Sequence, residues 1–169
     1  MSVDGVHHAA VLSLLIIVKN QIHILFTHRT SKVNHHKDQV SLPGGEYEIT
    51  DVDLVATAMR ETQEEIGVDI SRFEIIGQLS EIITPSGFLI TPFVGFKEKL
   101  FNLKINRREV KRVFSIPLSW FTRGKNWSYE YIEIPKNKRK KVIKFNNYGG
   151  EVVWGITAQI ILDLIQAII

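Results

Sequence analysis

The sequence predicts an α/β protein of the α+β kind, in which a mixed β-sheet lies between α-helices. Apolar runs rich in Val, Ile and Leu occur before and after one amphipathic segment, and another strongly apolar segment ends the chain. Short turn-forming clusters separate these runs, as expected when strands surround a central helix. The 169 residues are 44% hydrophobic and 23% charged, without an internal repeat or linker. This size and composition predict a single domain over residues 1–169.

The N-terminal strands are predicted as a hairpin. Residues 9–18 are apolar and largely β-branched, which is typical of a buried strand, and Lys19-Asn20 separates them from a second run at residues 21–28. A polar loop is expected over residues 29–37. A short strand then leads into Pro43-Gly44-Gly45, which predicts a turn.

The central helix follows this turn. We expect Thr50 or Asp51 to be its N-cap, with Asp53 adding negative charge where the helix dipole favours it. Gly67 is expected to end the helix. One face carries a mostly apolar stripe at helical spacing, formed by Val55, Met59, Thr62 and Ile66.

Further strands and a last helix are expected after the central helix. Residues 73–83 and 89–96 indicate strands that flank the turn Thr84-Pro85-Ser86-Gly87. Residues 129–134 and 142–145 indicate a second hairpin. The final helix is expected to start near Thr157.

The composition excludes several kinds of chemistry. The chain has no cysteine, which rules out disulfides, thiolate metal sites and cysteine nucleophiles. The apolar run at residues 12–18 is too short to cross a bilayer, and the C-terminal run is interrupted by Gln159, Asp163 and Gln166. We expect a cytoplasmic protein that does not associate with membranes.

The central helix also carries the clearest chemical signal. Glu61, Glu64 and Glu65 have the spacing i, i+3 and i+4, so they lie on one helical face and repel one another. Such a face is often just solvated, but here a Gly-rich segment precedes it and Arg60 lies beside it. Backbone amides of a Gly-rich segment suit a phosphate, and oxygen ligands suit Mg²⁺ or Mn²⁺. The sequence therefore predicts a cation site on this helix.

This segment resembles the Nudix box, whose core reads R-E-U-x-E-E-x-G-U, where U is aliphatic. Thr62 stands at an aliphatic position, and the acidic residue that precedes the core is Asp51. The lead from Gly45 is one residue longer than in the general box, which resembles the variant found in coenzyme A diphosphatases of the Nudix superfamily. The matching residues are Arg60, Glu61, Glu64, Glu65, Gly67 and Val68.

The segment upstream is similar to a second signature of that subfamily, L-L-T-x-R-S-x3-R-x3-G-x3-F-P-G-G. Asn34, Asp38 and Leu42 stand where this signature has Arg, Gly and Phe. The similarity continues at residues 86–95, 109–118 and 154–158. The positions that match the signature are Thr27, Arg29, Pro43, Gly44 and Gly45.

The resemblance implies a Nudix fold and Mg²⁺- or Mn²⁺-dependent hydrolysis of a phosphoanhydride bond in a nucleoside diphosphate linked to another group. It implies coenzyme A or a derivative as the substrate, with 3′,5′-ADP and (acyl-)4′-phosphopantetheine as products. Glu61, Glu64 and Glu65 are the expected metal ligands. One of these or Glu109 would be the general base, and Arg60 would orient a carboxylate. Arg29, Gly44 and Gly45 would contact the substrate.

Alternatives remain at this stage. One is a hydrolase of ADP-ribose, NADH or another dinucleotide, and another is a Nudix-fold module that binds a nucleotide without cleaving it. The basic tract at residues 136–141 could contact nucleic acid, but lysines at a hairpin tip are commonly solvated, so a nucleic-acid partner is disfavoured. The oligomeric state stays open, with a homodimer among the alternatives.

Overall fold

The computed structural model describes residues 2–3, 6–30, 39–69, 73–99, 102–124, 126–134 and 138–168. Asn34 and Asp38 lie outside these ranges. The helices are α1 (Leu54–Ile66), α2 (Leu118–Thr122) and α3 (Gly155–Ile168). The strands are β1 (Ser2–Val3), β2 (Val6–Val18), β3 (Gln21–Arg29), β4 (Val40–Ser41), β5 (Gly44–Glu46), β6 (Glu74–Gln78), β7 (Ile82–Ile83), β8 (Phe88–Lys97), β9 (Val110–Pro117), β10 (Trp127–Ile134) and β11 (Lys138–Phe145).

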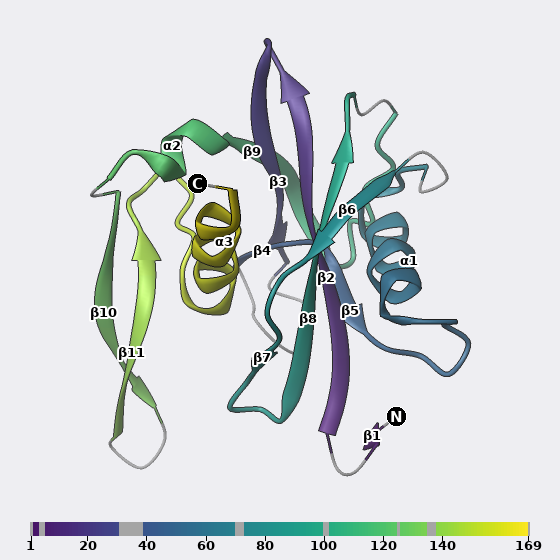
Figure 1. Ribbon diagram of the computed structural model, residues 1–169, viewed down its shortest axis with the longest axis horizontal. Helices are drawn as coiled ribbons and strands as arrows, with labels where there is room; N and C mark the ends of the chain where they lie inside the picture. The colour runs from purple at the N-terminus through teal and green to yellow at the C-terminus, as the bar shows by residue number, and fades with distance from the viewer. Residues whose placement is uncertain are drawn as a thin grey trace.

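Within the described residues, a nine-stranded mixed sheet forms the centre of the molecule (Figure 1). Its main path runs β4-β3-β2-β8-β6, and β5 and β9 add to β2 and β3. Strands β2 and β8 are parallel, whereas β3 and β5 pair with β2 in antiparallel fashion. Helix α1 lies on one side of this sheet and α3 on the other. The predicted mixed sheet between helices is therefore confirmed.

Each face of the sheet has its own apolar core. Successive side chains of a strand point to opposite faces, so Leu14 of β2 packs toward α1 while Leu15 packs toward α3. On the α1 side the helix contributes Ala58 and Ile66, both fully buried. On the α3 side Phe26 of β3 joins the buried residues of α3. These two cores hold α1 and the central strands in a fixed relation.

The first hairpin is confirmed, with Lys19 and Asn20 at φ +47° and +63° between β2 and β3. The single strand predicted over residues 73–83 is wrong. The register with β8 shifts between Ile75 and Gly77, and residues 79–81 then leave the ladder, so two strands form, β6 and β7. Helix α3 begins two residues earlier than predicted, at Gly155.

The second hairpin is longer than predicted and lies beside α3 (Figure 1). Part of the basic tract belongs to β11, where Lys141 Nζ lies 3.8 Å from the centroid of the Tyr129 ring. Residues 135–137 are outside the described part. In the part of the chain that the structure describes, every helix is too short or too polar to cross a membrane. The cytoplasmic location and the single domain over residues 1–169 stay predictions.

Candidate active site

Helix α1 begins and ends with two specific caps. The Asp53 carboxylate accepts a hydrogen bond of 2.7 Å from the Ala56 amide, so Asp53 is the N-cap. The expectation of Thr50 or Asp51 at this position is wrong. Gly67 has φ +68° and its amide donates to the Gln63 carbonyl, which confirms the predicted end.

A turn was predicted for Pro43-Gly44-Gly45, but the two glycines belong to strand β5 and Pro43 alone of the three lies in a bend. Gly44 and Gly45 pair with Val11 and Ala10 of β2. A side chain at Gly44 would place its Cβ 2.3 Å from the Ala10 carbonyl oxygen, so only glycine fits. A Cβ at Gly45 would lie 2.4 Å from Cδ of Glu61. Gly45 therefore lets the carboxylate of Glu61 lie directly against strand β5.

Asp51 anchors Arg60 against the loop that precedes the helix. Arg60 donates from Nε to Asp51 Oδ1 at 2.9 Å and from Nη2 to Asp51 Oδ2 at 3.0 Å. These bonds hold the pKa of Asp51 well below its usual range, against the effect of burial. Arg60 also donates from Nη1 to Glu61 at 2.8 Å. Asp51 is therefore unavailable as a helix cap because it fixes the arginine beside the acidic face.

Glu65 is the most buried carboxylate of the site. Only 2% of its side chain is exposed, and its Oε1 accepts a hydrogen bond of 3.1 Å from Nη1 of Arg29 in β3. Among the described residues, neither Glu65 Oε2 nor Arg29 Nε has a hydrogen-bond partner, although both atoms are buried. Burial raises the pKa of Glu65 to about 8, while the positive charge of Arg29 acts in the opposite direction.

The three glutamates of the acidic face differ in exposure, from buried Glu65 through Glu61 to exposed Glu64. Burial is the main cause of a raised pKa at Glu61, whereas 56% of the Glu64 side chain is exposed. The predicted apolar stripe is largely confirmed: Thr62 and Ile66 are buried, and half-buried Val55 packs against the α1-side core. Met59 is half-buried. The helix is rotated so that its buried residues are Thr57, Ala58, Thr62, Glu65 and Ile66.

The segment before β9 brings Glu109 to this helix. Backbone amides of Lys104 and Asn106 donate to the last helix carbonyls, those of Ile66 and Glu65. Asn106 Nδ2 also donates to Glu109 Oε1 at 3.0 Å. The charge of Glu109 raises the pKa of Glu61 and Glu65, as expected for neighbouring carboxylates.

Asn106 was not identified from the sequence as part of the site. Its side-chain oxygen accepts from the Arg108 amide at 3.2 Å, which forms a turn typical of asparagine. An Asn three residues before a candidate catalytic Glu was the available signal. That signal indicates a turn, and it does not indicate that the turn contacts helix α1.

The donor set fits a hard divalent cation. It consists of carboxylate oxygens, and Oε2 of Glu65 is buried without a hydrogen-bond partner among the described residues. Yet no group of three or more Asp, Glu or His side chains in this described part forms a ready-made metal site. Arg60 lies 2.8 Å from Glu61 and 3.4 Å from Glu64 and so occupies the acidic face itself. The assignment of Glu61, Glu64 and Glu65 as metal ligands stays a prediction.

Comparison with known proteins identifies the family. A family model for the NUDIX domain matches residues 6–132. A protein of Photorhabdus laumondii described as the uncharacterized Nudix hydrolase NudL is 34% identical over 165 residues, which cover 98% of this chain and 87% of that protein. NudL of Enterobacter sp. is 35% identical over 156 residues, covering 92% and 80% of the two chains.

Solved structures share the fold. The Nudix hydrolase RenU of M. smegmatis has a TM-score of 0.57 at 19% identity, covering 67% of this chain and 71% of RenU. The NUDIX domain of Shewanella oneidensis NrtR, crystallised with ADP ribose, has a TM-score of 0.52 at 21% identity, covering 68% and 74%. The fold is therefore that of a Nudix domain.

An α+β domain of this fold, with Glu61 of an acidic helix against Gly45 of a strand, is typical of hydrolases that act on pyrophosphate bonds. The chain belongs to the Nudix hydrolase family. It is an enzyme for nucleoside diphosphate-linked substrates, and members of the family generally need a divalent metal such as Mg²⁺ or Mn²⁺.

Proposed function

We propose that this enzyme hydrolyses the phosphoanhydride bond of coenzyme A or a derivative, to 3′,5′-ADP and (acyl-)4′-phosphopantetheine. The observation that carries the proposal is the convergence of two separate sequence signals on one site. Arg29, from the upstream signature, contacts Glu65, from the Nudix box, through a hydrogen bond of 3.1 Å. The segment that makes this box one residue longer than the general box includes Asp51. Arg60 donates two hydrogen bonds to the Asp51 carboxylate.

Glu61, Glu64 and Glu65 would hold a bound Mg²⁺ or Mn²⁺. Such a cation would neutralise charge on the diphosphate and lower the pKa of a water molecule. Glu61 and Glu65 have raised pKa values in the metal-free protein, so both gain from a neighbouring positive charge when they ionise.

The other residues of the site position these groups. Arg60, held by Asp51, keeps Glu61 oriented through its 2.8 Å hydrogen bond. Arg29 holds Glu65, and its guanidinium, on a side chain that is 21% exposed, suits a phosphate oxygen. Glu109, held by Asn106, is a candidate general base together with Glu61, Glu64 and Glu65.

The second candidate is a different substrate class. The observation that supports it is the departure from the subfamily signature at Asn34, Asp38 and Leu42. Asn34 replaces the positively charged Arg of the signature, and Asp38 adds a negative charge where the signature has Gly. These changes would suit a substrate without the 3′-phosphate of coenzyme A, such as ADP-ribose or NADH. A module that binds nucleotides without cleaving them is the alternative of a different class. It is disfavoured by the full set of box glutamates beside Arg60, because binding alone does not require three such carboxylates.

A single product assay separates these functions. Purified protein with Mg²⁺ or Mn²⁺ is incubated with coenzyme A, ADP-ribose, NADH and dinucleoside polyphosphates in parallel, and the products are identified by chromatography and mass spectrometry. We expect 3′,5′-ADP and 4′-phosphopantetheine from coenzyme A. Cleavage of ADP-ribose or NADH alone would support the second substrate class, and cleavage of none with measurable binding would support the module.

A further inference from the structure

A hollow of about 550 Å³ lies beside the first turn of helix α1, apart from the box glutamates. Its size is within the usual range of small-molecule sites. Its walls come from the helix start and from the loop after β5, and its floor comes from β2, β8 and the segment after β6. The lining residues are His8, Tyr47, Asp53, Leu54, Val55, Gln78, Glu81, Thr91 and Phe93.

The strand register explains this floor. Thr91 pairs with Ala10 of β2, and Ala10 faces the α1 side of the sheet. Phe93 lies two residues further along β8 on the same face and pairs with Gln78 of β6. Helix α1 starts only at Leu54, so this end of the α1-facing surface extends beyond the helix and forms an open hollow.

The polar groups of the hollow do not suit a phosphate. Among its nine lining residues only His8 has a basic side chain, whereas Asp53 and Glu81 have acidic ones. The Thr91 hydroxyl donates to Glu81 Oε1 at 2.8 Å, which fixes both groups. Leu54, Val55 and Phe93 supply apolar surface. The chemistry fits an uncharged ligand with aliphatic segments and amide or hydroxyl groups.

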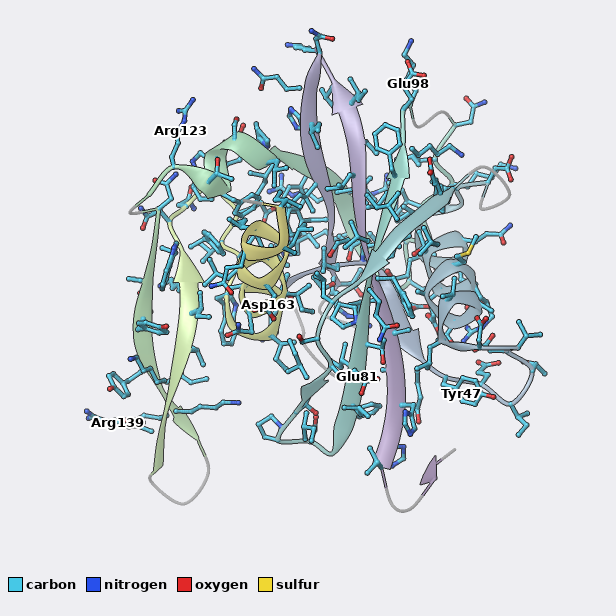
Figure 2. The ribbon with its side chains drawn as sticks, viewed as in Figure 1. Tyr47, Glu81, Glu98, Arg123, Arg139 and Asp163 are labelled. Atoms are coloured by element: carbon cyan, nitrogen blue, oxygen red, sulfur yellow. The ribbon has the colours of Figure 1, made fainter. Side chains whose placement is uncertain are left out.

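Strand β5 connects this hollow to the acidic face of helix α1, which carries Glu61. Gly45, which lies against Glu61, and Tyr47 are two residues apart and point to the same face. Two residues of extended chain span roughly 7 Å, and the amide of Tyr47 continues the ladder by donating to the His8 carbonyl. Tyr47 also lines a second hollow of about 440 Å³ that reaches Glu61. Figure 2 labels Tyr47 and Glu81, which both line the first hollow.

We propose that the first hollow is the subsite for the uncharged, amide-bearing arm of the substrate, which is pantetheine in coenzyme A. This inference rests on the proposed function. The diphosphate lies at Glu61 and Arg29, and the arm passes Tyr47 to reach Phe93 and Thr91. The acidic side chains of the hollow exclude the nucleotide phosphates, so the substrate binds in one direction only.

The test uses two changes to the hollow and one matched control in the full-length enzyme with Mg²⁺ or Mn²⁺. Val55→Phe fills the hollow, and Gln78→Leu removes an amide from an exposed strand position. Gln63→Leu makes the same exchange on an exposed part of α1 outside the hollow. Folding is checked by circular dichroism and thermal unfolding, and kcat and KM are measured for coenzyme A. Free pantetheine is added as a competing probe.

We expect both hollow variants to raise the KM for coenzyme A about tenfold or more with little change in kcat, as expected for lost binding contacts. Pantetheine should compete with coenzyme A in the unmodified enzyme and more weakly in the two variants, while Gln63→Leu should behave like the unmodified enzyme. If the unmodified enzyme cleaves coenzyme A but folded Val55→Phe and Gln78→Leu retain its KM, the subsite is overturned and the proposed function stands. If the unmodified enzyme does not cleave coenzyme A, both are overturned.

Discussion

Arg60 donates to both oxygens of the Asp51 carboxylate, through Nε at 2.9 Å and Nη2 at 3.0 Å. The two residues are nine positions apart, so this contact closes the loop before α1 onto the middle of the helix. Asp51 is almost fully buried, and Thr57 donates a further hydrogen bond to it at 2.8 Å. Because Arg60 also contacts Glu61, the orientation of the acidic face depends on this pair.

Replacing Asp51 with Asn should lower the free energy of unfolding by about 3 kcal/mol at neutral pH, because it leaves Arg60 with one fewer buried anion. The pKa of Asp51 is lowered in the folded state. Its contribution is therefore present above its unfolded pKa of about 4 and is lost as the pH falls toward the folded value. Urea unfolding at several pH values should show the difference between the two proteins narrowing below about pH 4.

Glu48→Gln is the control for this change. Glu48 also faces Arg60, at 3.8 Å, but 62% of its side chain is exposed. An exposed pair contributes about 0–1 kcal/mol, so the variant should unfold nearly as the unmodified protein does. If both variants lowered the free energy of unfolding equally, the burial of Asp51 would not contribute to stability.

The sequence was sufficient to predict helix α1 and its end at Gly67, because periodicity and a glycine stop are local signals. It was not sufficient to choose the N-cap. Thr50, Asp51 and Asp53 are all capping residue types. In the folded loop Asp51 binds Arg60, and Asp53 caps the helix by accepting a hydrogen bond from the Ala56 amide. The choice depended on a contact between distant residues.

The same limit applies to the burial of the site. Glycines at positions 44 and 45 predicted a turn, but their pairing with β2 makes them a strand. The spacing of Glu61, Glu64 and Glu65 placed all three on one face. It could not reveal that Glu65 is buried against Arg29 while Glu64 is exposed, since that depends on how the helix is rotated on the sheet.

Gly45→Ala should impair catalysis more than stability. The new Cβ would lie 2.4 Å from Cδ of Glu61, so the carboxylate must move. The backbone of Gly45 is outside the left-handed region, so alanine adds no backbone strain. We expect kcat/KM to fall about tenfold or more, which corresponds to about 1.4 kcal/mol of transition-state stabilisation. Steady-state kinetics and thermal unfolding measure the two effects.

Gly77→Ala provides the matched comparison, because a Cβ at this strand glycine meets no atom within 4 Å. It should leave kcat/KM unchanged. A Gly45→Ala enzyme with full activity would show that Glu61 does not need its position on strand β5.

Glu65→Gln should separate metal binding from folding. Because the pKa of Glu65 is raised to about 8, its stabilising contribution is complete below the unfolded pKa of about 4.5 and is lost as pH rises through the folded value. A neutral Gln avoids that loss, so the metal-free variant should be at least as stable as the unmodified protein at and above about pH 8. Its thermal stabilisation by Mg²⁺ or Mn²⁺ should disappear, with turnover reduced about 100-fold or more.

Glu74→Gln removes an exposed carboxylate on β6 and should leave the metal response intact. Normal stabilisation by Mn²⁺ in the Glu65→Gln protein would contradict the role of Glu65 as a ligand.

Metal affinity should rise with pH, because a cation must displace the proton from Glu65. Below about pH 8 the apparent affinity for Mn²⁺ should increase by up to about tenfold per pH unit and then level off. Arg29 lowers the pKa of Glu65, so Arg29→Leu should move this levelling to higher pH. Calorimetric titration with Mn²⁺ measures the affinity at each pH for the unmodified protein and for Arg29→Leu. Because no substrate is present, an effect of Arg29 on phosphate binding does not influence the result. A flat profile would contradict a protonated Glu65, and identical profiles would contradict control of Glu65 by Arg29.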